Sequence, residues 1–214
     1  AFTSEPNRFV TASSDGFLRV LNLPQSPPIV YLPDHDAAIT ALAWSPDGKF
    51  GLTAGAERSL RLYDMAQGRR LHEIPSLDAS VVTAALTSDG EAIALTRKGT
   101  VLRYHVGMGT LVAKISLPVQ RVATAHLDQN GERAIVADGS RAILFDLQRG
   151  AKVRELPGSQ LVQAVAISMD GKLAAIGSAD EIVRVYSVDS GSVLRSLDSP
   201  GGALMQLRFS ADGK

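Results

Sequence analysis

Residues 39–53 read ITALAWSPDGKFGLT and contain the pattern on which the rest of the chain is built. An apolar run ends at Trp44, a Ser-Pro-Asp-Gly turn follows at 45–48, and a second apolar run begins at Phe50. Because glycine after aspartate takes a positive φ without a Cβ clash, this stretch predicts two antiparallel strands joined by a tight turn.

The same turn returns at a nearly constant interval along the 214 residues. Similar turns occupy 4–7, 87–90, 128–131, 168–171 and 210–213, and from 45–48 onward each ends in glycine (Gly48, Gly90, Gly131, Gly171, Gly213). The glycines lie 42, 41, 40 and 42 residues apart. A period in the low forties indicates one structural unit that is copied along the chain and packs against its own neighbours.

Each repeat predicts four strands. The first alternates large apolar residues with small ones, which is typical of a strand with two different faces. The second follows the turn, and the third ends in an aromatic residue in four repeats: Tyr63, Tyr104, Phe145 and Tyr186. The fourth is short and charged, as at 70–74, and suits an exposed edge. One such sheet cannot bury both faces alone, so the sheets are expected to stack radially as propeller blades, with Trp44 in the core.

Composition excludes several classes of protein. The 22 basic and 22 acidic residues balance, so there is no net attraction to nucleic acid or to an anionic membrane. The absence of cysteine excludes disulfides and thiolate zinc sites, and no apolar run is long enough to cross a bilayer. We expect an intracellular protein, cytoplasmic or nuclear, although residues 1–4 look like the middle of a strand and leave a removed leader open.

The repeats resemble the WD40-repeat family of β-propellers over essentially the whole chain. The Ser-x-Asp-Gly turns carry the resemblance, together with third strands such as SLRLYD at 59–64 and AILFD at 142–146. The family's Trp-Asp is replaced by Tyr63-Asp64 or similar pairs, and its corner aspartate is matched by Asp15 and Asp180, with Glu57 in one repeat. His35 is the nearest match to the Gly-His pair. The family's buried His–Ser/Thr–Asp–Trp network is therefore expected to be incomplete in every repeat, and other propeller families remain an alternative.

Residues 1–214 are interpreted as a single WD40-like domain or fragment. They hold strands two to four of a first unit, four full units and a further first strand over 204–209, or about five blades. The last strand could complete the first sheet and close a five-bladed ring. Alternatively the chain belongs to a larger ring. Residues 2–7 already look like a strand end and turn, and the resemblance implies seven blades, so the larger, seven-bladed ring is favoured.

The resemblance implies a non-catalytic scaffold for protein–protein interaction within a multi-subunit complex, with no cofactor, metal or small-molecule substrate. Corners between strands two and three, and loops after strand four, should emerge on one face. We predict that this face receives an acidic peptide, another subunit or RNA phosphate through its basic sector, Arg97, Lys98, Arg121 and Arg141. The candidate face also includes the flanking residues Asp34, His35, Asp36, Glu57, Arg58, Asp78, Asp180 and Glu181.

Two other functions stay open from the sequence. His126 stands on the strand expected to line a central channel, where other repeats mostly have alanine, so a ligand-binding or catalytic role is an alternative. A metal-dependent propeller hydrolase could use carboxylates at the channel mouth, namely Asp34, Asp36, Glu57 and Asp78.

Overall fold

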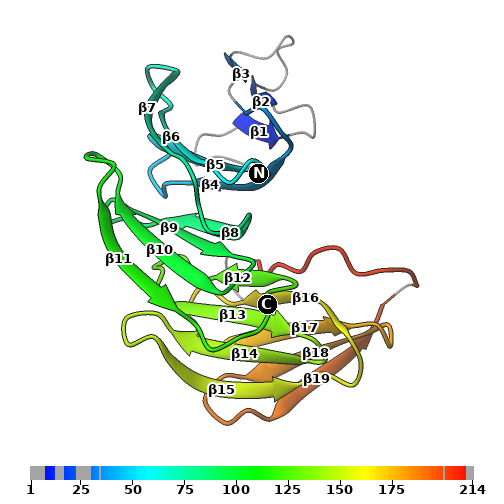
Figure 1. Ribbon diagram of the computed structural model, residues 1–214. Helices are drawn as coiled ribbons and strands as arrows, with labels where there is room; N and C mark the ends of the chain where they lie inside the picture. Colours follow the sequence, from blue (N-terminus) through cyan, green and yellow to red (C-terminus); the bar gives the residue numbers. More distant parts are fainter. Residues whose placement is uncertain (1–7, 13–16, 23–29, 34, 200, 211–214) are drawn as a thin grey trace. The chain divides into compact units, whose positions relative to one another are not determined.

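The computed structural model describes residues 8–12, 17–22, 30–33, 35–199 and 201–210 (Figure 1). Within these ranges all regular secondary structure is β, with no helix and hence none that could cross a membrane. The chain forms two compact units, one of residues 1–96 and 102–114 and the other of residues 97–101 and 115–214.

The strands form five antiparallel sheets, and in each sheet they follow one another in chain order. The first sheet has three strands, β1 (Arg8–Ala12), β2 (Phe17–Asn22) and β3 (Val30–Pro33). The second has β4 (Ile39–Trp44), β5 (Phe50–Gly55), β6 (Leu60–Asp64) and β7 (Arg69–Ile74). The third has β8 (Val81–Leu86), β9 (Glu91–Thr96), β10 (Thr100–His105) and β11 (Leu111–Ser116).

The last two sheets have the same plan. One has β12 (Ala125–Leu127), β13 (Arg133–Asp138), β14 (Arg141–Asp146) and β15 (Ala151–Pro157). The other has β16 (Val162–Ile167), β17 (Leu173–Ser178), β18 (Ile182–Ser187) and β19 (Val193–Asp198). The predicted four-stranded blades are confirmed in four sheets, and among the described residues the first sheet has three strands.

The repeated turn is held by its own side chains. Ser45 Oγ accepts a hydrogen bond from the Phe50 amide at 2.9 Å and donates one to Asp47 Oδ1 at 2.6 Å. Ser168 makes the equivalent bonds to Leu173 and Asp170 at 2.9 and 2.7 Å. These bonds fix the register of the first two strands, which explains why the Ser-x-Asp-Gly pattern is such a strong hairpin signal.

Neighbouring sheets bury their apolar faces against each other within each unit. In the first unit one cluster joins Leu52 and Leu62 of the β4–β7 sheet to Leu86 and Leu102 of the β8–β11 sheet. In the second unit a comparable cluster joins the β12–β15 and β16–β19 sheets, which lie over one another in Figure 1. The fourth strands are the most exposed, as their charged sequences predicted.

Three details differ from the predictions or lie beyond them. Trp44 is only half-buried, packed against Tyr63 and Met65, rather than fully in the core. The strand predicted over 204–209 is wrong, because these residues pair with no strand among those described; instead Leu204 and Leu207 lie against Gly177 of β17. The turn expected at 4–7 and most of the one at 210–213 lie outside the described residues.

Candidate functional site

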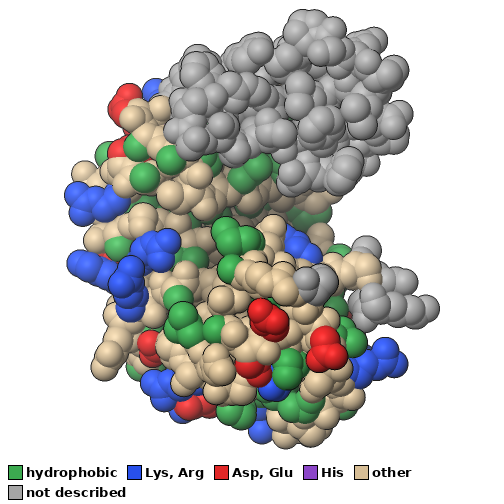
Figure 2. Space-filling view, turned by 90° about the vertical axis from the view of Figure 1, so that its right-hand side faces the viewer, with side chains coloured by type: hydrophobic (Ala, Val, Ile, Leu, Met, Phe, Trp, Pro, Cys, Tyr) green, Lys and Arg blue, Asp and Glu red, His purple; other side chains and the backbone are tan. Residues whose placement is uncertain are grey.

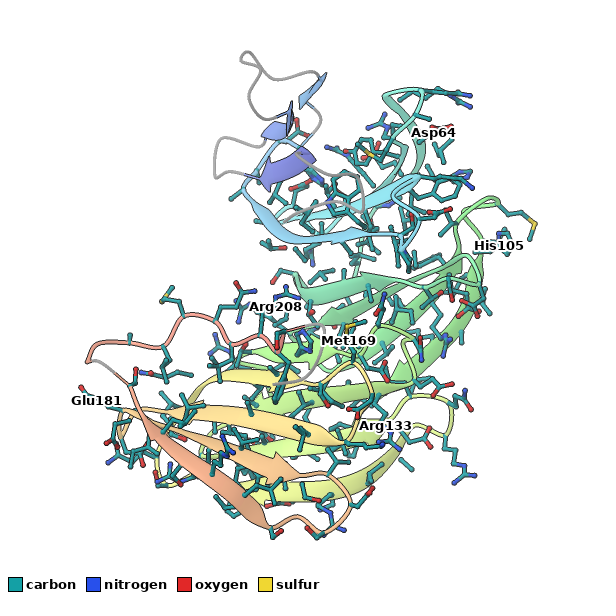
Figure 3. The ribbon with its side chains drawn as sticks, turned by 180° about the vertical axis from the view of Figure 1, so that it is seen from behind. Asp64, His105, Arg133, Met169, Glu181 and Arg208 are labelled. Atoms are coloured by element: carbon teal, nitrogen blue, oxygen red, sulfur yellow. The ribbon has the colours of Figure 1, made fainter. Side chains whose placement is uncertain are left out.

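The corner between the second and third strands of each four-stranded sheet is tied to the loop that follows the fourth strand. A carbonyl oxygen at the corner accepts a hydrogen bond from an amide of that loop at 2.7–2.9 Å. The acceptors recur at intervals of 41 residues: Arg58, Gly99, Ser140 and Glu181, bonded to the amides of Leu77, Leu117, Gly158 and Ser199. Corner and loop therefore emerge together at one end of each sheet, as predicted. Figure 3 shows Glu181 at this end of its sheet and the turn residue Met169 away from it.

The corner of the β4–β7 sheet contains a buried hydrogen-bond network. His35 Nδ1 donates to Glu57 Oε1, which also accepts from Ser59 Oγ at 2.7 Å. His35 Nε2 lies 2.7 Å from Thr53 Oγ1, which lies 3.4 Å from the Tyr63 hydroxyl. Burial raises the pKa of Glu57, but hydrogen bonds from His35 and Ser59 outweigh it and hold the pKa below its ordinary value.

This network bears on two predictions. The family's own set of four side chains is not present, but Glu57 and Tyr63 replace the aspartate and tryptophan with side chains that still reach their partners. The prediction places His35 on a partner-binding face, yet this residue is bound to Glu57 and its side chain is only 1% exposed, whereas that of Glu57 is 21% exposed.

Asp180 has a similar internal role at the corner of the β16–β19 sheet. It accepts hydrogen bonds from Ser159 Oγ and, at 2.7 Å, from Arg184 Nη2. The bonds from Arg184 and Ser159 lower the pKa of Asp180 to about 2. The carboxylate therefore remains ionised and holds the corner in place, and only its neighbour Glu181 is freely exposed.

The corner of the β8–β11 sheet is different, because it carries exposed cations. Arg97 and Lys98 stand at the corner, and the Val122 amide donates to the Arg97 carbonyl at 2.9 Å, which brings Arg121 beside them. All three side chains are exposed, and none of them forms an ion pair with a described residue.

The other candidate residues divide into three groups. Arg141 is exposed, but its charge is balanced by Asp138 at 3.5 Å and Glu155 at 3.3 Å, so it does not extend the basic group. Asp36 and Arg58 are exposed and Asp78 is half-buried. Asp34 lies outside the described residues.

His126 lies on β12 and is half-buried. The Ile167 amide lies 3.3 Å from Nδ1, and Arg208 Nη1 lies 3.4 Å from Nε2. Burial and the positive charge of Arg208 lower the pKa of His126 to about 4, so the ring is neutral at neutral pH. The charged neighbour of the His126 ring is thus the guanidinium of Arg208. The part of the chain that is described contains no group of three or more His, Asp or Glu side chains placed to hold a metal.

Sequence reasoning did not find the side chains that connect one sheet to the next. Arg154 of β15 donates to the carbonyls of Val188 and Asp189 at 3.1 and 2.7 Å. His72 of β7 lies against Gly109, with its Nε2 3.1 Å from the Gly107 carbonyl. The sequence does contain a sign of these contacts, namely the turn glycine five residues after a third-strand aromatic, as at Gly109 and Gly191. A glycine there leaves room for a side chain from the preceding sheet.

Comparison with known protein families gives one result. The family model described as "WD domain, G-beta repeat" matches residues 26–64 and 150–187. The first match ends with β6 and the second with β18, so each covers the corner and third strand of one sheet. No curated protein matches the sequence.

Proposed function

Because the chain belongs to the WD40-repeat family, we propose that it is a non-catalytic platform for protein partners within a multi-subunit assembly. WD40 repeats generally mediate protein–protein interaction or scaffolding. The proposal includes an intracellular location, cytoplasmic or nuclear, and a complete ring of seven blades to which the sheets described above contribute.

The recurring tie between corner and loop supports this proposal most directly. It holds two loops together at the same end of each sheet. Loops on a rigid scaffold commonly carry binding residues. The corners differ in charge from sheet to sheet, with Arg58, Lys98, Ser140 and Glu181 exposed, so each corner would offer a partner a different set of groups.

An RNA-associated role is the second candidate, and the exposed cations at Arg97, Lys98 and Arg121 are the observation that favours it. Against it stands the balance of 22 basic and 22 acidic residues. The face seen in Figure 2 shows both blue and red side chains, so it carries no uniform positive charge. The catalytic alternative depended on carboxylates around His126, and the charged side chain in contact with its ring is that of Arg208.

Affinity capture with two matched sets of variants tests the proposal. The corner set replaces Arg58, Lys98, Ser140 and Glu181; the turn set replaces the exposed turn residues Pro46, Ser88, Gln129 and Met169 at the opposite end of the same sheets. Partners that co-purify with the unmodified protein should be lost with the corner set and retained with the turn set, and cross-links to them should map to the corners. Loss with the turn set alone would contradict the proposal.

A further inference from the structure

We propose that Arg97, Lys98 and Arg121, which we call the basic corner, bind an acidic peptide segment of a protein partner. This inference rests on the proposed function and assigns the chemistry of one contact within it.

The basic corner is assembled by main-chain hydrogen bonds. The Val122 amide donates to the Arg97 carbonyl and the Leu117 amide to the Gly99 carbonyl, both at 2.9 Å. Gly99 has a φ of +78°, and a Cβ there would lie only 2.4 Å from Val119 Cγ2, so the two loops are in close contact. The cations are therefore brought together by the fold before any ligand arrives, which reduces the entropy lost on binding.

The charges of the basic corner are available to a ligand. Some basic side chains of the second unit have carboxylate partners: Arg184 with Asp180, Arg141 with Asp138 and Lys172 with Asp170. No described carboxylate pairs with Arg97, Lys98 or Arg121. An anionic ligand would therefore displace no internal ion pair.

Comparison between repeats shows that the basic corner replaces an internal anion with external cations. Lys98 stands 41 residues after Glu57 and 82 before Asp180, at the equivalent corner position. Glu57 is held by His35 and Ser59, and Asp180 by Ser159 and Arg184. In contrast, Lys98 is exposed and takes no part in an internal network. Its charge forms no ion pair with a described residue and is available to pair with an acidic ligand.

A peptide fits this surface better than a nucleic acid does. Proteins that bind single-stranded nucleic acid use a basic groove along the backbone and aromatic side chains for base stacking. Here three cations occupy one corner, and the loop beside them contributes Pro118, Val119 and Gln120, with no aromatic residue. A short acidic segment can pair with three cations while its other side chains contact Pro118 and Val119.

Binding of defined probes to the full chain tests this assignment. The probes are a fluorescent peptide rich in Asp and Glu, the same peptide with Asn and Gln instead, and a single-stranded RNA of equal length. We expect fluorescence anisotropy to show binding of the acidic peptide only, weakening as the salt concentration rises from about 0.05 to 0.5 M. The double variant Arg97→Glu/Arg121→Glu should bind it at least about tenfold more weakly, because two attractive pairs become repulsive.

A matched variant controls for net charge. Arg149 and Arg195 are exposed arginines of the same unit that pair with no described residue, so Arg149→Glu/Arg195→Glu changes the total charge equally. The affinity of this control for the acidic peptide should stay within about twofold of that of the unmodified protein, because exposed charges far from the binding site have little effect on binding. Equal weakening by both double variants, absence of peptide binding, or tighter binding of RNA would each overturn the proposal.

The outcome is separable from that of the proposed function. If co-purifying partners survive Arg97→Glu/Arg121→Glu but are lost when Arg58, Ser140 and Glu181 are replaced, the platform stands and the basic corner is not its contact. If no corner variant affects capture while the acidic peptide still binds, the proposed function fails and the peptide site remains. Circular dichroism of every variant verifies the fold, which exposed substitutions should leave intact.

Discussion

Gly55 leaves the space that Glu57 occupies. A Cβ on Gly55 would lie 2.0 Å from Glu57 Oε2, closer than any two such atoms can approach. Glycine at the end of β5 therefore allows the carboxylate to fold back and accept hydrogen bonds from His35 and Ser59. A residue that the sequence alone would present as an ordinary strand-end glycine is thus a requirement of the buried network.

The first prediction follows from this relationship. Gly55→Ala should displace Glu57 and destabilise the fold by about 1–3 kcal/mol, because buried partners are left without hydrogen bonds. Urea denaturation measures the change. In a Glu57→Ala background the same glycine substitution should have little effect, since the displaced carboxylate is gone. Additive effects of the two substitutions would show that Gly55 acts independently of the network.

The second prediction concerns Asp128, which occupies the turn position taken by Ser45 and Ser168 in other repeats. Burial raises the pKa of Asp128, although backbone hydrogen bonds oppose this. Because its pKa is higher in the folded protein, Asp128 keeps its proton there at pH values at which the unfolded chain has lost it. The free energy of unfolding therefore falls as the pH rises above 3.8, the ordinary pKa of an aspartate. Asp128→Asn keeps the oxygen that accepts from the Glu132 amide and removes the charge. The Asp128→Asn protein should be more stable than the unmodified protein at neutral pH and equally stable below pH 3.8, as urea denaturation at several pH values would measure. A gain in stability that does not depend on pH would contradict the raised pKa of Asp128.

The third prediction concerns His126, whose pKa is lowered from 6.5 to about 4 by burial and by Arg208. Between these values the unfolded chain binds the proton more strongly, so stability should fall as the pH drops from 6.5 to 4. The shift corresponds to a loss of up to about 3 kcal/mol. Thermal unfolding of His126→Ala, which installs the residue present at Ala43 and Ala85, should lack this component. His105→Ala, at a partly exposed position on β10, removes a histidine without changing the contact between His126 and Arg208 and serves as the matched control.

The fourth prediction tests backbone strain at the corners. Arg58 has a φ of 68°, a region that residues with a Cβ adopt at an energetic cost, and its side chain is exposed. Arg58→Gly should therefore raise the free energy of unfolding by up to about 1 kcal/mol. This figure is the relief of backbone strain minus the entropic cost of the more flexible glycine in the unfolded chain. Gly90 gives the reverse test, since its φ is +85° and nothing lies within 4 Å of the position that a Cβ would take. Gly90→Ala should destabilise by about 1–2 kcal/mol through the backbone alone, as chemical denaturation would show.

Much of the fold could be predicted because its signals are local and repeated. The turn from Ser45 to Gly48 specifies a hairpin by hydrogen bonds within six residues, and a turn of this kind closes the first hairpin of each later sheet. The order of strands in a sheet follows from short connections. The prediction over 204–209 failed because a strand also needs a neighbour to pair with, and sequence periodicity does not report whether that neighbour is present.

The candidate site was predicted less well, because charge at a corner does not reveal what the charge contacts. Glu57, Asp180 and Lys98 share one position in the repeat, yet the first two are bound internally and only Lys98 is free. The partners come from distant positions, as with His35 and Ser159, and depend on side-chain length. Arg141 was expected in the basic sector for the same reason, but its charge is neutralised by Glu155 on the next strand.

The tie between corner and loop uses only a main-chain amide and a main-chain carbonyl. It forms equally well with arginine, glycine, serine or glutamate at the acceptor position, as Arg58, Gly99, Ser140 and Glu181 demonstrate. Arginine, serine and glutamate therefore each occur at this position with the bond intact, whereas Gly99 is restricted by the close approach of Val119 Cγ2. The exposed side chains of Arg58, Ser140 and Glu181 can consequently diverge, and recognition properties with them, while the underlying sheets remain unchanged.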